Sequence, residues 1–578
     1  MTSRAGTPSP TDPARPASID AWADIGAERD HAAVLAAAVA VVARALDVDV
    51  AFEIDGAPVA PDDAILGIEV DPELLSAWGP WLPGQLREAL LDRRSRAAGG
   101  VHHTAPDVAA AVVDVAAGVR PFGLDDIVLD PAVGGGAFLL AVAERLSGAR
   151  ADVIARLRGL DTDPLAVATS IAALRLWAGG APVGENALRV GDGLTDVTDE
   201  RIDWVIGNPP FLAQLKGETV RDRARHASLR RRWPELGAYT DDAAAFLLAG
   251  ADAVRPDGVV ALVQPTSVLS ARDAAAVRSR LTTDAPLQAI WLDDGRRFDA
   301  AVDTVALVLQ RGADTAPVAR FVGVPPVARA DGPPGERWAA LLIDDPAAWL
   351  GDDEFSAGAV VGDVASVTAG FRDQFYGLRG AVHEDPDAEC RLITSGLIDP
   401  LEDRWGTTPC RFDGRRWEHP GVRVADVDPS IAAWVAARLR PKLLVANQTR
   451  TIEVLIDDTG GTVPCTPVVS VEPGEDGPSL AHLAAALCSP VATALLLREA
   501  AGSALSSDAM RISAAAIAAL PLPVEGAAWD AAAALVTRRR RDPTAVSVEA
   551  IGEAAMAAYG VEGRSDLHKW WHSRLPRR

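Results

Sequence analysis

The chain has 578 residues, of which 49% are apolar and 24% are charged. This balance is typical of globular proteins and excludes a largely disordered one, and at about 150 residues per domain the length predicts three or four structural units. The 80 acidic and 56 basic side chains give a formal net charge of −24, which disfavours a generally basic surface for nucleic acid and makes local basic segments informative.

The few lysines and cysteines exclude several kinds of site. None of the three lysines, Lys216, Lys442 and Lys569, follows a glycine, so the chain has no Gly-Lys-Ser/Thr phosphate loop. No carboxylate stands two positions before a lysine, so the D/ExK pattern of many nucleases is absent too. None of the four cysteines belongs to a CxxC pair, which argues against a disulfide framework or a structural zinc site.

The N-terminal part of the chain predicts no membrane or export segment. Residues 1–19 are rich in Pro, Ser and Thr and lack an apolar signal core, so we expect a disordered tail. Residues 20–95 predict short amphipathic helices. The apolar run 32–48 contains Arg44 and is too short to span a bilayer. We therefore expect a cytoplasmic protein without a membrane partner.

Between residues 96 and 320, apolar strand-like runs alternate with alanine-rich helical runs. Repeated strand, turn and helix predict an α/β fold with a parallel, doubly wound, Rossmann-like sheet. The expected strands are 127–130, 156–161, 204–207, 259–264 and 304–310.

Three acidic residues follow expected strands in order. Asp130 precedes the glycine-rich turn 134–136, which can approach a ligand closely before a helix begins. Asp161 ends the second strand, where a carboxylate can accept both hydroxyls of a ribose, and Asp192 follows a third strand, where it could accept from the amine of adenine. Each of these aspartates alone is more typical of a surface or helix-capping residue. The ordered series predicts a nucleoside site.

The most specific pattern is Asn208-Pro209-Pro210-Phe211, which directly follows an apolar run. An amino group conjugated to an aromatic ring is a poor nucleophile because its lone pair is delocalised. The Asn208 side-chain oxygen and the Pro209 carbonyl can accept its two hydrogens and favour a tetrahedral nitrogen, while the prolines fix the carbonyl direction. Phe211 offers a flat face on which a base swung out of a duplex can stack. The alternative is a rigid diproline turn.

A basic segment follows this pattern. Residues 216–232 contain seven Lys and Arg against two acidic side chains, a local charge of +5. Such a run is either a solvated helix face or a phosphate-binding surface. Because it comes directly after the diproline segment, we expect Arg230, Arg231 and Arg232 to contact DNA phosphates.

Beyond residue 320 the strand-like runs are shorter and richer in Pro and Gly. Residues 443–457 and 462–472 predict two strands around a turn. Gln448, Thr449 and Arg450 lie between strand candidates, where they could contact base edges or form an ordinary polar turn. The aromatic segment 371–376 could face DNA, but we expect it to fill a small β core.

Four segments in order resemble motifs I to IV of class I S-adenosylmethionine-dependent methyltransferases. They are most similar to those of the γ-class N6-adenine DNA methyltransferases of bacterial restriction–modification and phage-defence systems. The segments 94–113 and 240–281 resemble the motifs that flank them, and the likeness extends over about residues 80–525. The four segments are DPAVGGGAFL (130–139), GLDTDP (159–164), GDGL (191–194) and NPPF (208–211).

The chain departs from this family at two places. Val133-Gly134-Gly135 stands where the family usually has Cys-Gly-Ser, and His102-His103-Thr104-Ala105 stands where it has Tyr-Tyr-Thr-Pro. The glycine backbone is retained, so the likeness still implies cofactor binding. Adjacent histidines on an extended segment point to opposite faces, which favours a buried or stacking role over metal ligation.

The resemblance implies S-adenosyl-L-methionine as cofactor, double-stranded DNA as substrate and no metal. Asp161 would hold the ribose, Asp192 the adenine amine, and Asp130, Gly134 and Thr104 the methionine end. No general base is implied, because the amine proton can leave after methyl transfer. The implied cofactor residues are Thr104, Asp130, Pro131, Gly134, Gly136, Asp161 and Asp192, the catalytic residues Asn208, Pro209, Pro210 and Phe211, and the DNA-binding residues Arg230, Arg231, Arg232 and Arg450.

The resemblance also implies a domain order. We expect a helical N-terminal domain, the catalytic domain, an α+β target-recognition domain and a C-terminal helical segment, with a separate nuclease, specificity or defence subunit as a further partner. The expected ranges are 1–19 for the tail, then 20–95, 96–320, 321–525 and 526–578.

Two alternatives remain open. Asn-Pro-Pro-aromatic also occurs in enzymes that methylate guanine N2 in ribosomal RNA or glutamine amides in release factors. These usually lack a long region after the catalytic domain, whereas roughly 270 residues follow residue 310 here. The chain could instead be a non-catalytic, methylase-like subunit that recognises DNA. The intact NPPF segment favours an adenine-N6 DNA methyltransferase.

Overall fold

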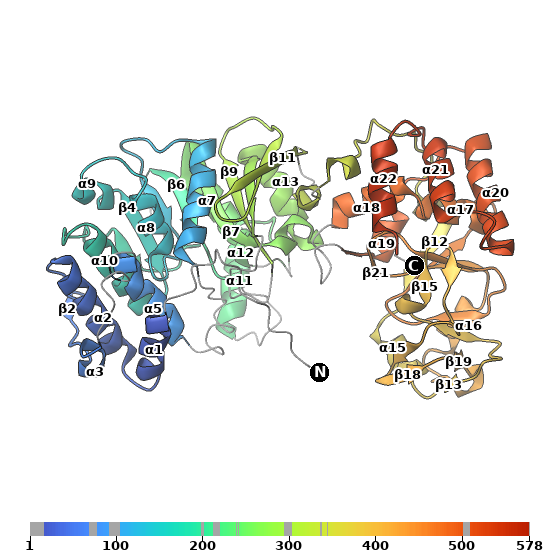
Figure 1. Ribbon diagram of the computed structural model, residues 1–578, viewed down its shortest axis with the longest axis horizontal. Helices are drawn as coiled ribbons and strands as arrows, with labels where there is room; N and C mark the ends of the chain where they lie inside the picture. The colour runs from blue at the N-terminus through green and yellow to red at the C-terminus, as the bar shows by residue number, and fades with distance from the viewer. Residues whose placement is uncertain are drawn as a thin grey trace. The chain divides into compact units, whose positions relative to one another are not determined.

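The chain forms two compact units, residues 1–336 and 337–578, shown in Figure 1. Each is described by itself. The computed structural model describes residues 17–68, 75, 78–91, 104–197, 201–211, 220–237, 240, 242–293, 303–333, 335, 338–343, 345–500 and 509–576.

A nine-stranded sheet forms the centre of the first unit. Its strands are β3 (Val128–Asp130), β4 (Leu157–Asp161), β5 (Leu188–Val190), β6 (Ile202–Gly207), β7 (Val254–Pro265), β8 (Leu287–Leu292), β9 (Thr304–Gln310), β10 (Val318–Val322) and β11 (Val327–Gly332).

The spatial order of these strands is β11-β10-β8-β9-β7-β6-β3-β4-β5. Strands β3 to β7 run parallel, whereas β9 is antiparallel to both of its neighbours, β7 and β8. The chain proceeds outward from β3 in one direction through β4 and β5, and in the other through β6 and β7. This reversal creates a switch point beside β3, where ligands bind in open α/β sheets. The structure confirms the predicted doubly wound sheet.

Helices cover this sheet because its central strands are apolar on both sides. Every residue of β6 is buried, as expected of a parallel strand covered on both faces. In Figure 1, α7 and α8 lie in front of the sheet, and α12 packs on β7. The bounds are α7 (Pro106–Val119), α8 (Ala137–Ala143), α10 (Pro164–Trp177), α12 (Asp242–Ala253) and α13 (Ala275–Asp284).

The N-terminal helices share a core with the sheet domain. Helices α1 (Ala17–Gly26), α2 (His31–Leu46) and α5 (Leu82–Leu90) bury their apolar side chains against Ala168, Ala172 and Leu176 of α10. The predicted helical region therefore belongs to the same compact unit as the sheet. At the other end of the unit, β10 and β11 continue the sheet past residue 320.

The second unit contains two four-stranded sheets and a set of helices. One sheet has the order β12-β24-β20-β22 and the other β13-β19-β14-β23. Their strands are β12 (Ala365–Ala369), β24 (Val469–Pro473), β20 (Lys442–Val445), β22 (Val454–Asp457), β13 (Val382–Glu384), β19 (Pro420–Val422), β14 (Arg391–Ile393) and β23 (Thr462–Pro464).

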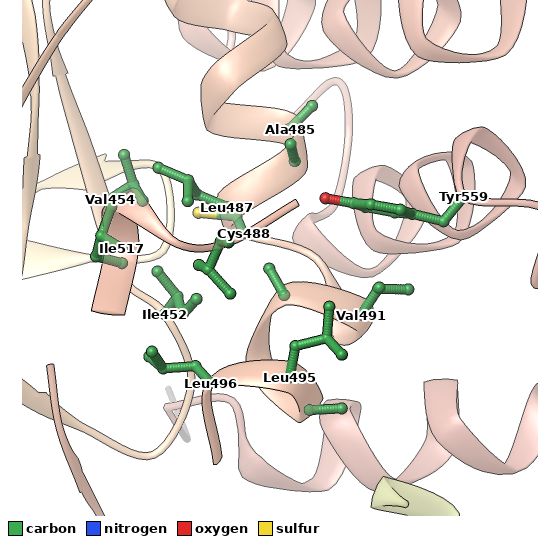
Figure 2. Packing of buried hydrophobic residues seen from close by; sticks show 14 of the residues in the cluster. Ile452, Val454, Ala485, Leu487, Cys488, Val491, Leu495, Leu496, Ile517 and Tyr559 are labelled. Carbon is green, nitrogen blue, oxygen red and sulfur yellow. The ribbon is translucent and has the colours of Figure 1, made fainter. Parts of the chain in front are cut away.

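The C-terminal helices of this unit pack into the core of its first sheet. Figure 2 shows Ile452 and Val454 beside Cys488 and Val491, with Tyr559 near by. Residues 526–578 therefore contribute to the same core as the sheet. The helices are α17 (Leu480–Leu487), α18 (Pro490–Ala500), α20 (Ala527–Arg541), α21 (Val548–Ala558) and α22 (Ser565–Arg574).

The hairpin predicted over residues 443–472 is correct only in part. The outer strands of the two segments, β20 and β24, pair antiparallel as expected. The strands that flank the turn do not pair with each other: β22 pairs with β20, whereas β23 pairs in parallel with β14 in the other sheet. The turn between β22 and β23 is held by Asp457, which accepts from the Gly460 and Thr462 amides and forms a buried ion pair of 2.6 Å with Lys442. The pairing of β23 with β14, which is distant in sequence, takes the chain from one sheet to the other, and local turn chemistry does not reveal it.

Within the described ranges, no single helix has the length and hydropathy needed to cross a bilayer. The consecutive helices Leu480–Leu487 and Pro490–Glu499, bent by 60° at their junction, meet the criterion together by length and composition only.

Candidate active site

Four of the predicted site residues lie at the carboxyl ends of neighbouring strands. Asp130 ends β3, Asp161 ends β4, Asp192 follows β5 and Asn208 follows β6. The strands are adjacent and parallel in the order β5-β4-β3-β6, so their carboxyl ends form one edge of the sheet. The fold therefore brings together the residues that the sequence predicted for a nucleoside and for an amino group.

The glycine-rich turn after β3 is fixed by its neighbours. Gly134 and Gly136 have φ values of 53° and 85°, a left-handed conformation that favours glycine. The Gly134 amide donates to Asp161 at 2.9 Å, and the Gly134 carbonyl accepts from the Ser170 hydroxyl at 2.9 Å. The Asp163 amide donates to the other oxygen of Asp161 at 2.9 Å. Each oxygen of Asp161 thus retains a lone pair for a ribose hydroxyl.

Asp130 lies at the switch point and is only 1% exposed. Its carboxylate accepts from the Ala132 amide at 3.0 Å, and it fills the space where a side chain on Gly207 would lie. Burial raises the pKa of the Asp130 carboxyl to about 8, and the charge of Asp161 acts in the same direction. Gly207 is a site residue that the sequence did not reveal, because its role depends on the neighbouring strand.

Asn208 is oriented by Thr104. Its amide nitrogen donates to the Thr104 hydroxyl at 3.0 Å, while its side-chain oxygen is buried and has no hydrogen-bond partner among the described residues. A buried acceptor without a partner costs about 1–3 kcal/mol. Pro209 is buried, and Phe211 packs against the core of the first unit. The arrangement leaves an acceptor ready for an N–H donor.

Asp192 is held by the basic helix α11 (Val220–Arg232). Its carboxylate accepts from the Leu194 amide and from Arg225, both at 3.0 Å. Arg225 also donates to Asp242 at 2.6 Å, so two carboxylates offset its charge. The helix predicted to contact DNA therefore lies beside the residue predicted to contact adenine.

The three arginines at the end of α11 differ in exposure. Arg231 and Arg232 are exposed, and Arg230 is half-buried. Arg232 donates to the Leu194 carbonyl at 3.0 Å and stacks over Trp233 at 4.5 Å. Residues 216–219 of the predicted basic segment lie outside the described residues, as do His102 and His103. Among the described residues, no group of three or more His, Cys, Asp or Glu could hold a metal ion.

In the second unit, the predicted base-contacting segment is part of the packed structure. Gln448 and Thr449 form β21, which pairs with β25 (Met510–Arg511). The Arg450 carbonyl accepts from Arg574 of α22 at 2.9 Å, and Arg450 is half-buried. The role of Arg450 in DNA binding stays a prediction.

The expectation that residues 371–376 fill a β core is correct only in part. Phe375 packs against Phe412 with ring centres 5.0 Å apart, but Phe371 and Tyr376 are 74% and 47% exposed. Phe371 precedes α15 (Arg372–Leu378). Its amide donates to Gln374 and its carbonyl accepts from Thr466. These bonds fix the backbone so that the ring points away from the core.

Helix α5 lies in the region 20–95 that the sequence predicted to be helical, but its packing on the site was not predicted. Gly84 in α5 touches the backbone of Gly135 in the glycine-rich turn, and Gln85 donates to the Thr104 carbonyl at 3.4 Å. Arg87 donates to Asp163 at 2.5 Å. No sequence pattern indicates this packing, because only the structure shows that the polar residues of the helix are buried: Gln85, Arg87 and Glu88 are 2%, 5% and 8% exposed.

Comparison with known proteins agrees with this geometry. Residues 84–321 match the family model described as N-6 DNA Methylase, which agrees with the family predicted for this part of the chain. No curated protein sequence matches the chain.

Several solved structures are similar to this chain, and for the first of them the TM-score exceeds 0.5. The structure of the type IIL restriction-modification enzyme MmeI in complex with DNA is 12% identical, with a TM-score of 0.55 over 96% of this chain and 93% of that one. The type IIG restriction endonuclease BpuSI is 14% identical, with a TM-score of 0.44 over 97% and 80%. A type I methyltransferase subunit from Streptococcus thermophilus is 19% identical, with a TM-score of 0.34 over 43% and 55%.

The raised pKa of Asp130 predicts a pH dependence of stability. The pKa of this carboxyl is about 8 in the folded protein and about 4 in the unfolded chain, so the folded state binds the proton more tightly. Its contribution to the free energy of unfolding is therefore complete below pH 4 and is lost as the pH rises to about 8. Asp130→Asn should therefore gain stability relative to the parent across this range, by a few kcal/mol, in urea unfolding measured from pH 3 to 9.

Asp126→Asn provides a control of opposite sign. The pKa of Asp126 is lowered: burial opposes this shift, but hydrogen bonds from Arg120, Gly123 and Trp204 outweigh it. Its contribution is present at neutral pH and is lost in acid. Parallel profiles for the parent and Asp130→Asn would show that Asp130 is ionised in the folded state.

Proposed function

We propose that this chain, whose residues 84–321 belong to the N-6 DNA methylase family, transfers a methyl group to the exocyclic N6 of an adenine rotated out of double-stranded DNA. The observation that carries the proposal is the buried, unpartnered side-chain oxygen of Asn208, which Thr104 holds in place. An exocyclic amine is the donor that would satisfy it.

The site residues activate the amino group by orienting it and by removing it from water. Asn208 and the Pro209 carbonyl accept one hydrogen each, which draws the nitrogen lone pair out of conjugation. Because Asn208 is fixed before the substrate arrives, little reorganisation is needed when it binds. Phe211 supplies the face on which the flipped ring stacks. The nitrogen loses its proton after the new N–C bond has formed, so no residue is required as a base beforehand.

The residues at the strand ends fit S-adenosyl-L-methionine. Asp161 retains acceptor capacity beside a turn whose glycines adopt left-handed conformations, as a ribose site requires. The cofactor supplies a methyl group on a positively charged sulfur. The residues proposed to hold it are Thr104, Asp130, Pro131, Gly134, Gly136, Asp161 and Asp192.

Replacement of Asn208 tests the function directly. Asn208→Ala should reduce methyl transfer by at least 100-fold while cofactor affinity changes little, because the lost hydrogen bond acts on the target amine. Tritiated methyl transfer to unmethylated DNA and calorimetric titration of the cofactor would measure the two effects. Asn186→Ala, at an exposed asparagine of the same unit, is the matched control. Transfer at the parent rate by Asn208→Ala would contradict the proposed function.

We further propose that α11 contacts DNA phosphates. It follows the diproline segment in sequence, and Arg231 and Arg232 are exposed. The fold neighbour MmeI was solved in complex with DNA, which supports DNA as the polymer substrate. A separate nuclease or specificity subunit would be needed for restriction, because the sequence contains neither a phosphate loop nor a D/ExK pattern.

The salt dependence of DNA binding tests whether α11 contacts DNA phosphates. Replacing Arg230, Arg231 and Arg232 with Ala should weaken DNA binding and lower the slope of log K against log salt by roughly one per lost phosphate contact. Fluorescence anisotropy from 50 to 300 mM salt would measure it. Arg201→Ala removes an exposed arginine at the amino end of β6, away from the carboxyl edge, and should leave the slope unchanged. An unchanged slope in the triple variant would remove α11 from the interface.

The second unit, which contains most of residues 321–525, is proposed as the target-recognition domain. Phe371 and Tyr376 are the two aromatic residues among its exposed large apolar side chains in the described ranges. Arg379 stacks on Tyr376 at 4.6 Å and pairs with Asp413 at 2.7 Å. Asp413 lies in the turn between β17 (Cys410–Phe412) and β18 (Arg415–Trp417).

This hairpin is rich in arginine. Arg411 and Arg416 lie directly opposite each other across the two strands, and both are exposed, as is Arg415. Like charges at opposed positions are unfavourable in a hairpin. Glu418 pairs with Arg416 at 3.3 Å and offsets part of the repulsion, and an anionic ligand would offset more of it. Arginines beside exposed aromatic rings are suited to phosphates and bases together.

Phe371→Ala should lower the affinity for unmethylated DNA that contains the enzyme's target sequence by about tenfold, since one aromatic–base contact contributes about 1–3 kcal/mol. Cofactor affinity should not change. Val524→Ala, at a 52% exposed valine of the same unit, is the control. Equal DNA binding by Phe371→Ala and the control would place recognition elsewhere.

A further inference from the structure

Helix α5 forms a wall of the glycine-rich turn. A Cβ added to Gly84 would lie 2.5 Å from the Gly135 carbonyl oxygen, and one added to Gly135 would lie 2.6 Å from the Gly84 Cα. The two backbones are therefore in direct contact. The helix lies about 50 residues before the turn in sequence and is buried over nearly its whole length, so it has little solvent-facing surface of its own.

Arg87 is the buried cation of this helix. Its side chain is 6% exposed and donates through Nη2 to Asp163 at 2.5 Å. Its Nε and Nη1 atoms are buried and have no hydrogen-bond partner among the described residues. A guanidinium keeps its charge under all ordinary conditions, and burying it with few of its donors satisfied is costly. A contribution to folding stability therefore does not explain why Arg87 is buried at this position.

A short chain of contacts joins Arg87 to Asp161. Asp163 accepts from Arg87 and from the Leu165 amide at 2.9 Å, where it caps α10. The Asp163 amide donates to Asp161, as does the Gly134 amide. Arg87 thus fixes the turn that supplies half of the hydrogen bonds to the proposed ribose carboxylate.

Arg87 is the main positive charge that acts on Asp161. The pKa of Asp161 is raised, first by burial and also by the Asp163 carboxylate; the Asp163 and Gly134 amides and the charge of Arg87 oppose the rise. The Asp130 carboxyl faces it from β3. Without Arg87, two acidic groups would remain beside Asp161, and only backbone amides would favour its ionised form.

We propose that Arg87 is a positioning residue of the cofactor site, which fixes the turn at Asp163 and keeps Asp161 ionised to accept the ribose hydroxyls. The proposal rests on the proposed function, because it takes the ligand to be a nucleoside-containing methyl donor. Helix α5 would then contribute to the cofactor site, although it precedes the sheet in sequence.

Calorimetric titration with S-adenosylhomocysteine between pH 4 and 9 tests this role. In Arg87→Met, which keeps much of the apolar stem, affinity should fall about tenfold at neutral pH. Because protonation of Asp161 removes an acceptor, affinity should fall further as the pH is lowered, with the midpoint of the loss at least about one pH unit above that of the parent. Arg87→Lys, which retains the charge, should restore most of the parent pH profile.

Arg29→Met is the matched control, since Arg29 pairs with Asp62 at 3.0 Å in the same helical region and is 44% exposed. A loss of affinity in Arg87→Met that is equal at every pH, or no loss, would overturn the proposal. So would an Arg87→Lys profile that follows Arg87→Met. Should Arg87→Met fail to fold by circular dichroism, the Arg87→Lys titration decides between these outcomes.

Failure of the proposed function is distinguishable from failure of this inference. A parent protein that binds S-adenosylhomocysteine and methylates DNA, together with a pH-independent Arg87→Met, contradicts only the role of Arg87. A parent protein that binds no such nucleoside contradicts both.

Discussion

The contact between the Asp130 carboxylate and Gly207 joins the two halves of the site. Asp130 ends β3 and Gly207 ends β6, and the carboxylate lies where a side chain on Gly207 would be. The residues proposed for the cofactor follow β3, β4 and β5, and those proposed for the target base follow β6. The distance between the two groups is therefore set by a buried packing contact in the sheet and does not depend on loop conformation. Such a contact is stiff, because close-packed interiors yield little.

Local patterns were sufficient to predict this edge of the sheet. The glycine-rich turn, the acidic strand ends and the NPPF segment each lie within a few residues of a strand, and the parallel topology aligns those strand ends. Residues 104 and 208 are far apart in sequence, yet both were identified because each has its own motif; their hydrogen bond needed the structure.

Contacts without a local motif were not predictable. The packing of Gly84 on Gly135, the space at Gly207 and the separation of β22 from β23 all depend on partners distant in sequence. In the segment 371–376 the aromatic residues suggested a core, but only Phe375 is packed, because the Phe371 amide donates to Gln374 and its carbonyl accepts from Thr466, which holds this backbone in place. The net charge of −24 likewise gave no information about Arg225, whose charge is offset by two buried or half-buried carboxylates.

The backbone contact between Gly84 and Gly135 sets a lower limit on how far the chain can be shortened. A fragment that starts at the glycine-rich turn, or at the first strand of the sheet, would lose the surface that closes one side of that turn, together with the guanidinium next to Asp163. Chimeric enzymes assembled from this chain must therefore take α5 and the sheet from the same parent, since the fit between them leaves no space for even one additional methyl group.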